Sequence, residues 1–213
     1  MTRLTDKKIV ALTGMSGAGK STVCRCFRDA GFIVIDCDEV AHEVTSRGKP
    51  SVKELAQYLS PDIVDTDGAL DRRKTAELIF NDHDKLQLFN RIIYPYITYD
   101  MVSRIKGASS DVLLDAPTIF EARLDGICDS IVSVCADTEK CIERIMLRDN
   151  ITRQHAAARL GSQKNIDFFR SVTDICIENN GTEQELFEKA NKAISELKGD
   201  IWKKDARKTE NIL

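Results

Sequence analysis

Residues 14–21 read Gly-Met-Ser-Gly-Ala-Gly-Lys-Ser, which fits the GxxxxGK[ST] pattern of a phosphate-binding loop. The apolar run Ile9–Leu12 precedes the loop and has the length of a buried strand, and a stretch of helical character follows it. Glycines in such a loop let backbone N–H groups approach phosphate oxygens, and the N-terminus of the helix favours the same anions. This context predicts an α/β fold built around a nucleotide-phosphate site.

Two side chains at the end of the loop have separate expected roles. Lys20 is expected to place its charge near the β- and γ-phosphates, and the Ser21 hydroxyl to ligate Mg²⁺. The full set of residues expected to bind the nucleotide here is Gly14, Ser16, Gly17, Ala18, Gly19, Lys20, Ser21 and Thr22.

Composition excludes several classes of partner. The 213 residues are 42% hydrophobic and carry a formal net charge of −3, so we expect no basic surface for nucleic acid or for an anionic membrane. The apolar run near the N-terminus is too brief for a signal peptide, and no later segment has the length of a membrane span. A cytoplasmic location is therefore expected, and a monomer is compatible with the sequence.

The seven cysteines do not suggest a metal or disulfide site. Their number is odd and no CxxC pair occurs, so neither a disulfide framework nor a zinc site is predicted. Cys24 and Cys26, the nearest pair, would point in nearly opposite directions on a helix. We expect all seven to be reduced.

Short apolar runs rich in β-branched residues indicate a parallel sheet buried on both faces. These runs are Ile9–Leu12, Phe32–Ile35, Val112–Leu114 and Ile131–Val134. The segment between the second and third runs is mostly helical and too long for one crossover, so residues 39–107 are expected to form a helical insertion. Pro95 is expected to interrupt one of its helices.

Three carboxylates follow predicted strands, where ligands bind in open α/β sheets. If the chain stays extended after Ile35, Asp36 and Asp38 lie on one side of it, one as a base and the other as a ligand of ribose or metal-bound water. Asp115 is expected to support Mg²⁺. The alternatives are structural: Asp38 caps a helix that starts at Glu39, and Asp115 caps a helix or turn.

Arginines are concentrated in a predicted helix pair after the fourth strand, at residues 144, 148, 153 and 159. A mobile hairpin that carries arginines suits a phosphoryl-transfer site, which must cover charge and exclude water. The alternative is a solvated surface row. His42 shares no metal-ligand spacing with the other histidines, but its place near the acidic pair makes it a candidate substrate contact.

Several segments together resemble the dephospho-CoA kinase family, and they occur in the family's order over about residues 8–197. They are residues 14–22, VIDCDEVAH at 34–42, DGALDR at 67–72, LDAP at 114–117 with FE at 120–121, RD at 148–149, and DICIENNG at 174–181. The last resembles the family's nucleotide-base loop, which implies that Asn179 and Gly181 bind ATP.

The resemblance implies transfer of the ATP γ-phosphate to the ribose 3′-hydroxyl of dephospho-CoA, with ATP and Mg²⁺ as cofactors. It makes Asp38 the base, Lys20 the phosphate clamp, Ser21 the Mg²⁺ ligand and Arg148 a lid contact. Asp36, His42 and Asp115 remain the candidates for contact with the substrate. The implied fold is a three-layer P-loop kinase with four parts: a parallel-sheet core at 1–38, 108–137 and 164–198, an acceptor domain at 39–107, a lid at 138–163 and a flexible tail at 199–213.

The chain departs from the family pattern at three places. Tyr94 precedes Pro95 where the family usually has His, Lys164-Asn165 replaces Met-Pro, and Glu178 replaces Asp.

Two alternative functions remain. Another small-molecule or nucleoside monophosphate kinase would share the loop and the lid but should lack the VIDCDEVAH block, and a P-loop ATPase-like module would need a residue that orients water.

Overall fold

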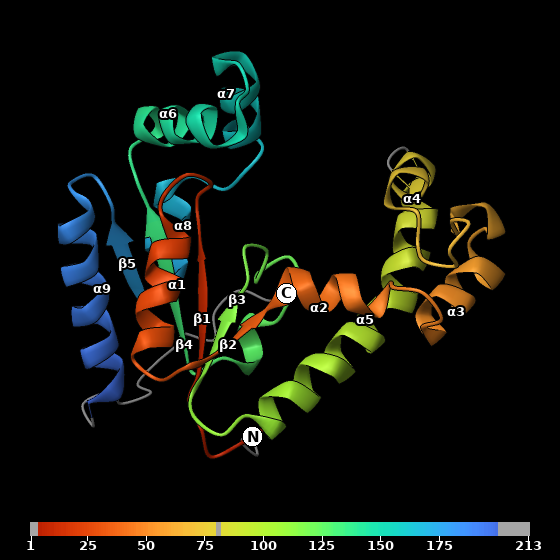
Figure 1. Ribbon diagram of the computed structural model, residues 1–213, viewed down its shortest axis with the longest axis horizontal. Coiled ribbons are helices and arrows are strands. Elements are labelled where there is room, and N and C mark those ends of the chain that lie inside the picture. The colour runs from red at the N-terminus through yellow and green to blue at the C-terminus, as the bar shows by residue number, and fades with distance from the viewer. Residues whose placement is uncertain (1–3, 80–81, 200–213) are drawn as a thin grey trace. The chain divides into compact units, whose positions relative to one another are not determined.

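The computed structural model of the protein describes residues 4–79 and 82–199 (Figure 1). The chain divides into two compact units. We call residues 35–108, together with Leu4, the helical unit, and residues 5–34 and 109–199 the sheet unit. The tail expected at 199–213 lies, from residue 200 onward, outside the described residues.

Five strands form one sheet with the order β2-β3-β1-β4-β5. Their bounds are β1 Ile9–Gly14, β2 Ile33–Asp36, β3 Val112–Asp115, β4 Ser130–Cys135 and β5 Ile175–Glu178. β1 pairs in parallel with β3 and with β4, and β4 pairs in parallel with β5. The predicted α/β class and the four predicted strands are confirmed, and β5 is a strand that the sequence analysis did not identify.

The central strands are buried because helices cover the sheet. All six residues of β4 are buried, which explains why its sequence shows no alternation of polar and apolar residues. Helices α1 (Lys20–Asp29) and α9 (Glu183–Lys198) pack against each other, whereas α8 (Ile166–Val172) packs against β4 and β5 (Figure 1).

Helices α6 (Thr138–Asp149) and α7 (Arg153–Gly161) pack together as a hairpin in the sheet unit (Figure 1). Asn150 follows α6 with a left-handed backbone, φ 51°, a conformation that asparagine adopts more readily than most residues. The Thr152 side chain then accepts a hydrogen bond from the His155 N–H and caps α7. These two residues explain why the chain reverses at this point.

The helical unit contains α2 (Cys37–Val44), α3 (Pro50–Tyr58), α4 (Arg72–Ile79) and α5 (His83–Gly107). Short 3-10 helices occur at Pro61–Ile63 and, in the sheet unit, at Asp125–Ile127. The core of the helical unit is made of Val44, Leu55, Ile63, Ile92 and Ile93.

The interruption expected at Pro95 is wrong, because Pro95 lies inside the continuous helix α5. A proline in this position removes one backbone hydrogen bond, and the long helix tolerates that loss. Among the described residues, no helix is both long enough and apolar enough to cross a membrane.

Candidate active site

The chain between β1 and α1 turns sharply, and two of its glycines are required by what surrounds them. Gly19 precedes α1 with φ 101°, and a Cβ atom there would lie 2.6 Å from Nδ2 of Asn179. A Cβ atom on Gly17, with φ 76°, would lie 2.7 Å from the carbonyl oxygen of Cys141 in α6. Both the backbone conformation and the packing therefore exclude other residues at these positions.

Asn179 and Arg144 hold the carbonyl groups of the loop. The buried Asn179 side chain donates from Nδ2 to the Ala18 carbonyl at 2.8 Å, and its own N–H donates to the Cys135 carbonyl. Arg144 donates from Nη1 to the Gly17 carbonyl and from Nη2 to the Asn179 carbonyl, each at 3.3 Å. One guanidinium thus joins the loop to the segment after β5.

Several N–H groups of the loop, unlike these carbonyls, remain available to a ligand. Within the described residues, the N–H groups of Gly17, Gly19, Lys20 and Ser21 donate no hydrogen bond. Unpartnered N–H groups at a glycine-rich turn and at the start of a helix form an anion site. The geometry therefore fits phosphate oxygens, as the sequence motif predicts.

Lys20 and Asp115 form an ion pair at the end of the loop. Asp115 ends β3, and its Cα pairs with that of Leu12 in the neighbouring β1, so the topology brings the two side chains together. Their side chains are 22% and 16% exposed, so the pair is largely shielded from solvent. The positive charge of Lys20 is therefore partly neutralised before any phosphate arrives.

The residues fit a magnesium site of the kind that is completed by phosphates. Mg²⁺ usually takes one or two protein side chains together with substrate phosphates and several waters. Ser21, in the first turn of α1, and Asp115 are the two side chains that the sequence analysis assigned to it. No cluster of three or more His, Cys, Asp or Glu side chains within the described residues is arranged to hold a metal without a substrate.

The thiol of Cys24, in α1, has no such role. None of the seven cysteines forms a disulfide in the described residues, and five of them are buried. Burial, together with the nearby charge of Asp115, raises the pKa of the Cys24 thiol to about 11. Cys24 is therefore a neutral thiol at physiological pH rather than a nucleophile or a metal ligand.

The structure corrects the expected arrangement of Asp36 and Asp38. The chain is not extended after Ile35, because α2 begins at Cys37. Asp36 is the residue before this helix, and its Oδ1 accepts hydrogen bonds from the N–H groups of Asp38 and Glu39 at 2.9 and 3.1 Å. The helix cap is thus Asp36 rather than Asp38, and Asp38 lies exposed in the first turn of α2.

His42 lies one turn further along α2, and its side chain contacts that of Arg72. The distance from Arg72 Nη2 to His42 Nδ1 is 2.8 Å, which requires Nδ1 to act as the acceptor. The contact joins the segments 34–42 and 67–72 that carry the family resemblance. It also places a cation and an imidazole side by side on the surface of the helical unit.

Arginines of the α6–α7 hairpin are engaged within the protein. Arg148 makes a two-bond ion pair with the neighbouring Asp149, at 2.8 and 2.9 Å, and Arg159 joins the same carboxylate. The hydrogen bond from Arg148 lowers the pKa of the Asp149 carboxyl. Arg153 pairs with Glu139. Of the four arginines, Arg144 alone contacts the phosphate loop.

The sequence analysis did not identify Gln163 as a residue that contacts the phosphate loop. Its Oε1 accepts a hydrogen bond from the Ser16 N–H at 3.0 Å, so the segment after α7 reaches back to the loop. Glutamine carries no distinctive spacing, and the signal available was its position directly after the arginine-rich hairpin.

Two departures from the family pattern have structural partners. Asn165 precedes α8 and accepts a hydrogen bond from the Phe168 N–H at 2.9 Å, so it caps that helix. Glu178 accepts two hydrogen bonds from Arg170.

Gly181 lies against the capping carboxylate of Glu185, where a Cβ atom would collide with Oε2 at 1.5 Å.

A family model described as dephospho-CoA kinase matches residues 8–185. The dephospho-CoA kinase of Enterococcus faecalis is 32% identical over 195 residues, which cover 90% of this chain and 98% of that relative. The enzyme of the same name from Oryza sativa is 30% identical over 211 residues, which cover 96% and 91%.

Solved structures show the same fold. The protein TT1252 from Thermus thermophilus superposes with a TM-score of 0.80 at 30% identity, over 92% of this chain and all of that one. A dephospho-CoA kinase from Campylobacter jejuni superposes with a TM-score of 0.60 at 22% identity, over 90% and 97%.

Proposed function

The chain belongs to the dephospho-CoA kinase family, and from this premise we propose that it transfers the γ-phosphate of ATP to the ribose 3′-hydroxyl of dephospho-CoA. The product of this reaction is coenzyme A. The observation that carries the proposal is the family match across residues 8–185, which includes the phosphate loop and both segments at 34–42 and 67–72.

On the nucleotide side, the loop and Lys20 supply the electrostatic part of the reaction. The unpartnered N–H groups of the loop hold the phosphates in place, and the Lys20 ammonium stabilises charge on the transferring group. Lys20 must exchange the carboxylate of Asp115 for phosphate oxygens. Arg144 acts indirectly: its hydrogen bond to the Gly17 carbonyl keeps that oxygen turned away from the nucleotide.

We propose that Ser21 and Asp115 hold Mg²⁺. Mg²⁺ held by these residues would neutralise negative charge on the phosphates. Asp115 bound to Mg²⁺ would no longer pair with Lys20, and the Lys20 ammonium would then be available to the phosphates.

On the acceptor side, we propose that Asp38 accepts the proton of the 3′-hydroxyl as its oxygen attacks the γ-phosphorus. The new bond joins that oxygen to phosphorus, and the bond between phosphorus and the β–γ bridging oxygen breaks. His42 and Arg72 are neighbours on the same unit, and their donors suit the phosphate groups of the acceptor. The cytoplasmic location and the absence of nucleic-acid or membrane partners stay predictions.

A phosphotransfer assay with ATP, Mg²⁺ and a panel of acceptors tests the proposal. We expect dephospho-CoA to be phosphorylated at the 3′-position, with nucleoside monophosphates and sugar acids accepting at least about a hundredfold less efficiently. Mass spectrometry and digestion with a 3′-nucleotidase locate the new phosphate. Preference for a nucleoside monophosphate would favour the alternative kinase, and ATP hydrolysis with no acceptor would favour an ATPase.

We also propose that residues 138–163 act as a lid. Arg148 now directs Nε and Nη2 at Asp149, and we expect these donors to turn to a phosphate when nucleotide binds, which would reorganise this hairpin. Hydrogen exchange with and without a non-hydrolysable ATP analogue is expected to show slower exchange in α6 and α7 at saturating nucleotide. Unchanged protection from hydrogen exchange in both helices would indicate that these arginines are surface residues with no role in a lid.

A further inference from the structure

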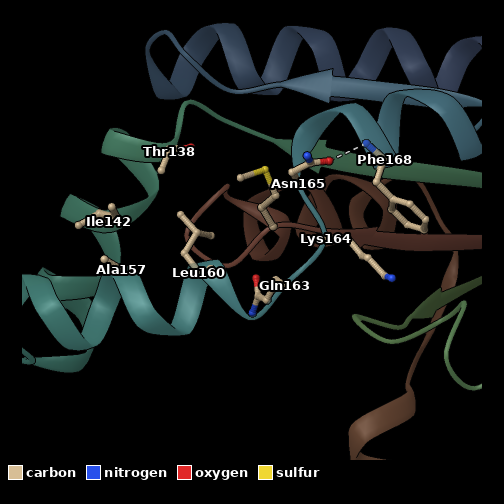
Figure 2. A pocket seen from close by; sticks show the side chains of 10 residues that line it. Thr138, Ile142, Ala157, Leu160, Gln163, Lys164, Asn165 and Phe168 are labelled. Atoms are coloured by element: carbon tan, nitrogen blue, oxygen red, sulfur yellow. Dashed lines mark hydrogen bonds between the residues drawn. The ribbon is translucent and has the colours of Figure 1, made fainter.

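A cavity of about 550 Å³ lies in the sheet unit beside the phosphate loop. Figure 2 shows Ile142, Ala157 and Leu160 of the α6–α7 hairpin on one side, and Lys164 and Phe168 on the other. Its volume is within the range of cavities that bind small molecules, and most of its lining side chains are apolar. None of the residues assigned to ATP from the sequence lines it.

The cavity reaches the loop at two points. Met15, the second residue of the loop, forms part of its wall. Gln163, also in the wall, is hydrogen-bonded through Oε1 to the Ser16 N–H. A group bound in the cavity therefore lies next to the first part of the phosphate loop.

Helix α6 separates the cavity from the segment assigned to the base of ATP. Thr138 and Ile142 line the cavity, whereas Lys140 and Arg144 donate hydrogen bonds to the carbonyls of Asn180 and Asn179. Residues two positions apart on a helix point in nearly opposite directions. A nucleotide whose base lies against residues 179–181 therefore leaves the cavity empty.

The lining chemistry suits a purine. Apolar side chains and the ring of Phe168 offer surfaces for the faces of a flat aromatic group. Asn165 uses its carbonyl oxygen to cap α8 and Gln163 uses its own on the loop, so the amide N–H₂ groups remain as donors. Ring nitrogens of adenine are acceptors. Lys164, whose ammonium lies 5.1 Å from the centre of the Phe168 ring, adds a cation for a phosphate attached to the same ligand.

We propose that this cavity binds the adenine ring of the acceptor, an inference that rests on the proposed transfer to dephospho-CoA. Both substrates of that reaction carry adenine, and α6 separates this cavity from the segment assigned to ATP. The reacting 3′-hydroxyl belongs to the ribose bonded directly to the acceptor's adenine. An adenine held beside Met15 and Gln163 therefore brings that hydroxyl close to the loop.

Two neighbouring alanines of α7 provide a matched test. Ala157 lines the cavity and Ala158 does not, although both are exposed on the same helix. Ala157→Phe should fill the cavity and raise the dissociation constant of dephospho-CoA about tenfold or more, with that of the ATP analogue changed less than about twofold. Ala158→Phe should leave both constants within about twofold. Calorimetry measures each ligand alone, and melting temperatures check that both variants are folded.

The outcomes separate this inference from the proposed function. If Ala157→Phe binds both ligands as the wild type does, the cavity does not hold the acceptor, whereas the proposed function stands on the wild-type assay. If the variant instead loses the ATP analogue, the cavity takes the base of ATP and the inference is wrong. Ala157→Leu, a smaller addition, should give an intermediate loss of dephospho-CoA affinity if filling is the cause.

Discussion

Lys20→Ala is expected to lower the rate of phosphoryl transfer on the order of 100-fold or more, because it removes a preorganised charge from the transferring phosphate. Loss of the ammonium also leaves the carboxylate of Asp115 beside the loop without this cation. Steady-state kinetics with ATP and dephospho-CoA measure the effect. The decrease should appear mainly in kcat, since the N–H groups of the loop still hold the phosphates.

Lys192→Ala is the matched control for this change. Lys192 lies on α9 with a side chain 80% exposed, and its replacement removes the same charge far from the chemistry. It should leave kcat within about twofold, as expected for a surface pair of this kind. A folded Lys20→Ala protein that transfers phosphate at nearly the wild-type rate would disprove the assignment of the phosphate loop.

Asp38→Asn is expected to lower dephospho-CoA phosphorylation by about 10²- to 10⁴-fold, the usual range for loss of a general base. The asparagine keeps the size of the side chain and its place in the first turn of α2, but it cannot take the proton. ATP binding, measured by calorimetry, should be nearly unchanged, because the proposed partner of Asp38 is the hydroxyl of the acceptor and not the nucleotide. Glu39→Gln, a neighbouring exposed carboxylate, is the control and should retain activity.

Asp36→Asn distinguishes the two members of the acidic pair. Asparagine caps helices about as well as aspartate, so this variant removes the charge of Asp36 and keeps α2 intact. If Asp36→Asn is inactive and Asp38→Asn is active, the roles are reversed. If both transfer phosphate normally, the pair is structural and the mechanism proposed for the acceptor side is wrong.

The sheet and the phosphate loop could be predicted from the sequence because their signals are local. Buried parallel strands appear as short apolar runs, and the loop combines a fixed spacing with a strand before it and a helix after it. β5 was missed because it is short, its four residues include Cys176 and Glu178, and only Ile177 is fully buried. A half-buried edge strand of this kind has the composition of a loop.

Contacts made through tertiary structure could not be predicted in the same way. An arginine in a helix shows its charge and its spacing, but not that Arg144 bonds the carbonyls of Gly17 and Asn179. The geometry of Asp36 was misjudged for a different reason. Its sequence fits both a continued strand and a helix cap, and the cap is the outcome because it satisfies two N–H groups at the start of α2.

The contacts that shape the phosphate loop also determine when, during synthesis and folding, the protein becomes able to bind nucleotide. The loop is synthesised early, yet the side chains that hold it come much later: Arg144 is 127 residues beyond Gly17, Gln163 is 147 beyond Ser16, and Asn179 is 161 beyond Ala18. Contacts so distant along the chain close late in folding. A growing polypeptide therefore carries the complete motif long before the loop has its final form. Nucleotide recognition then reports that almost the whole sheet unit has assembled.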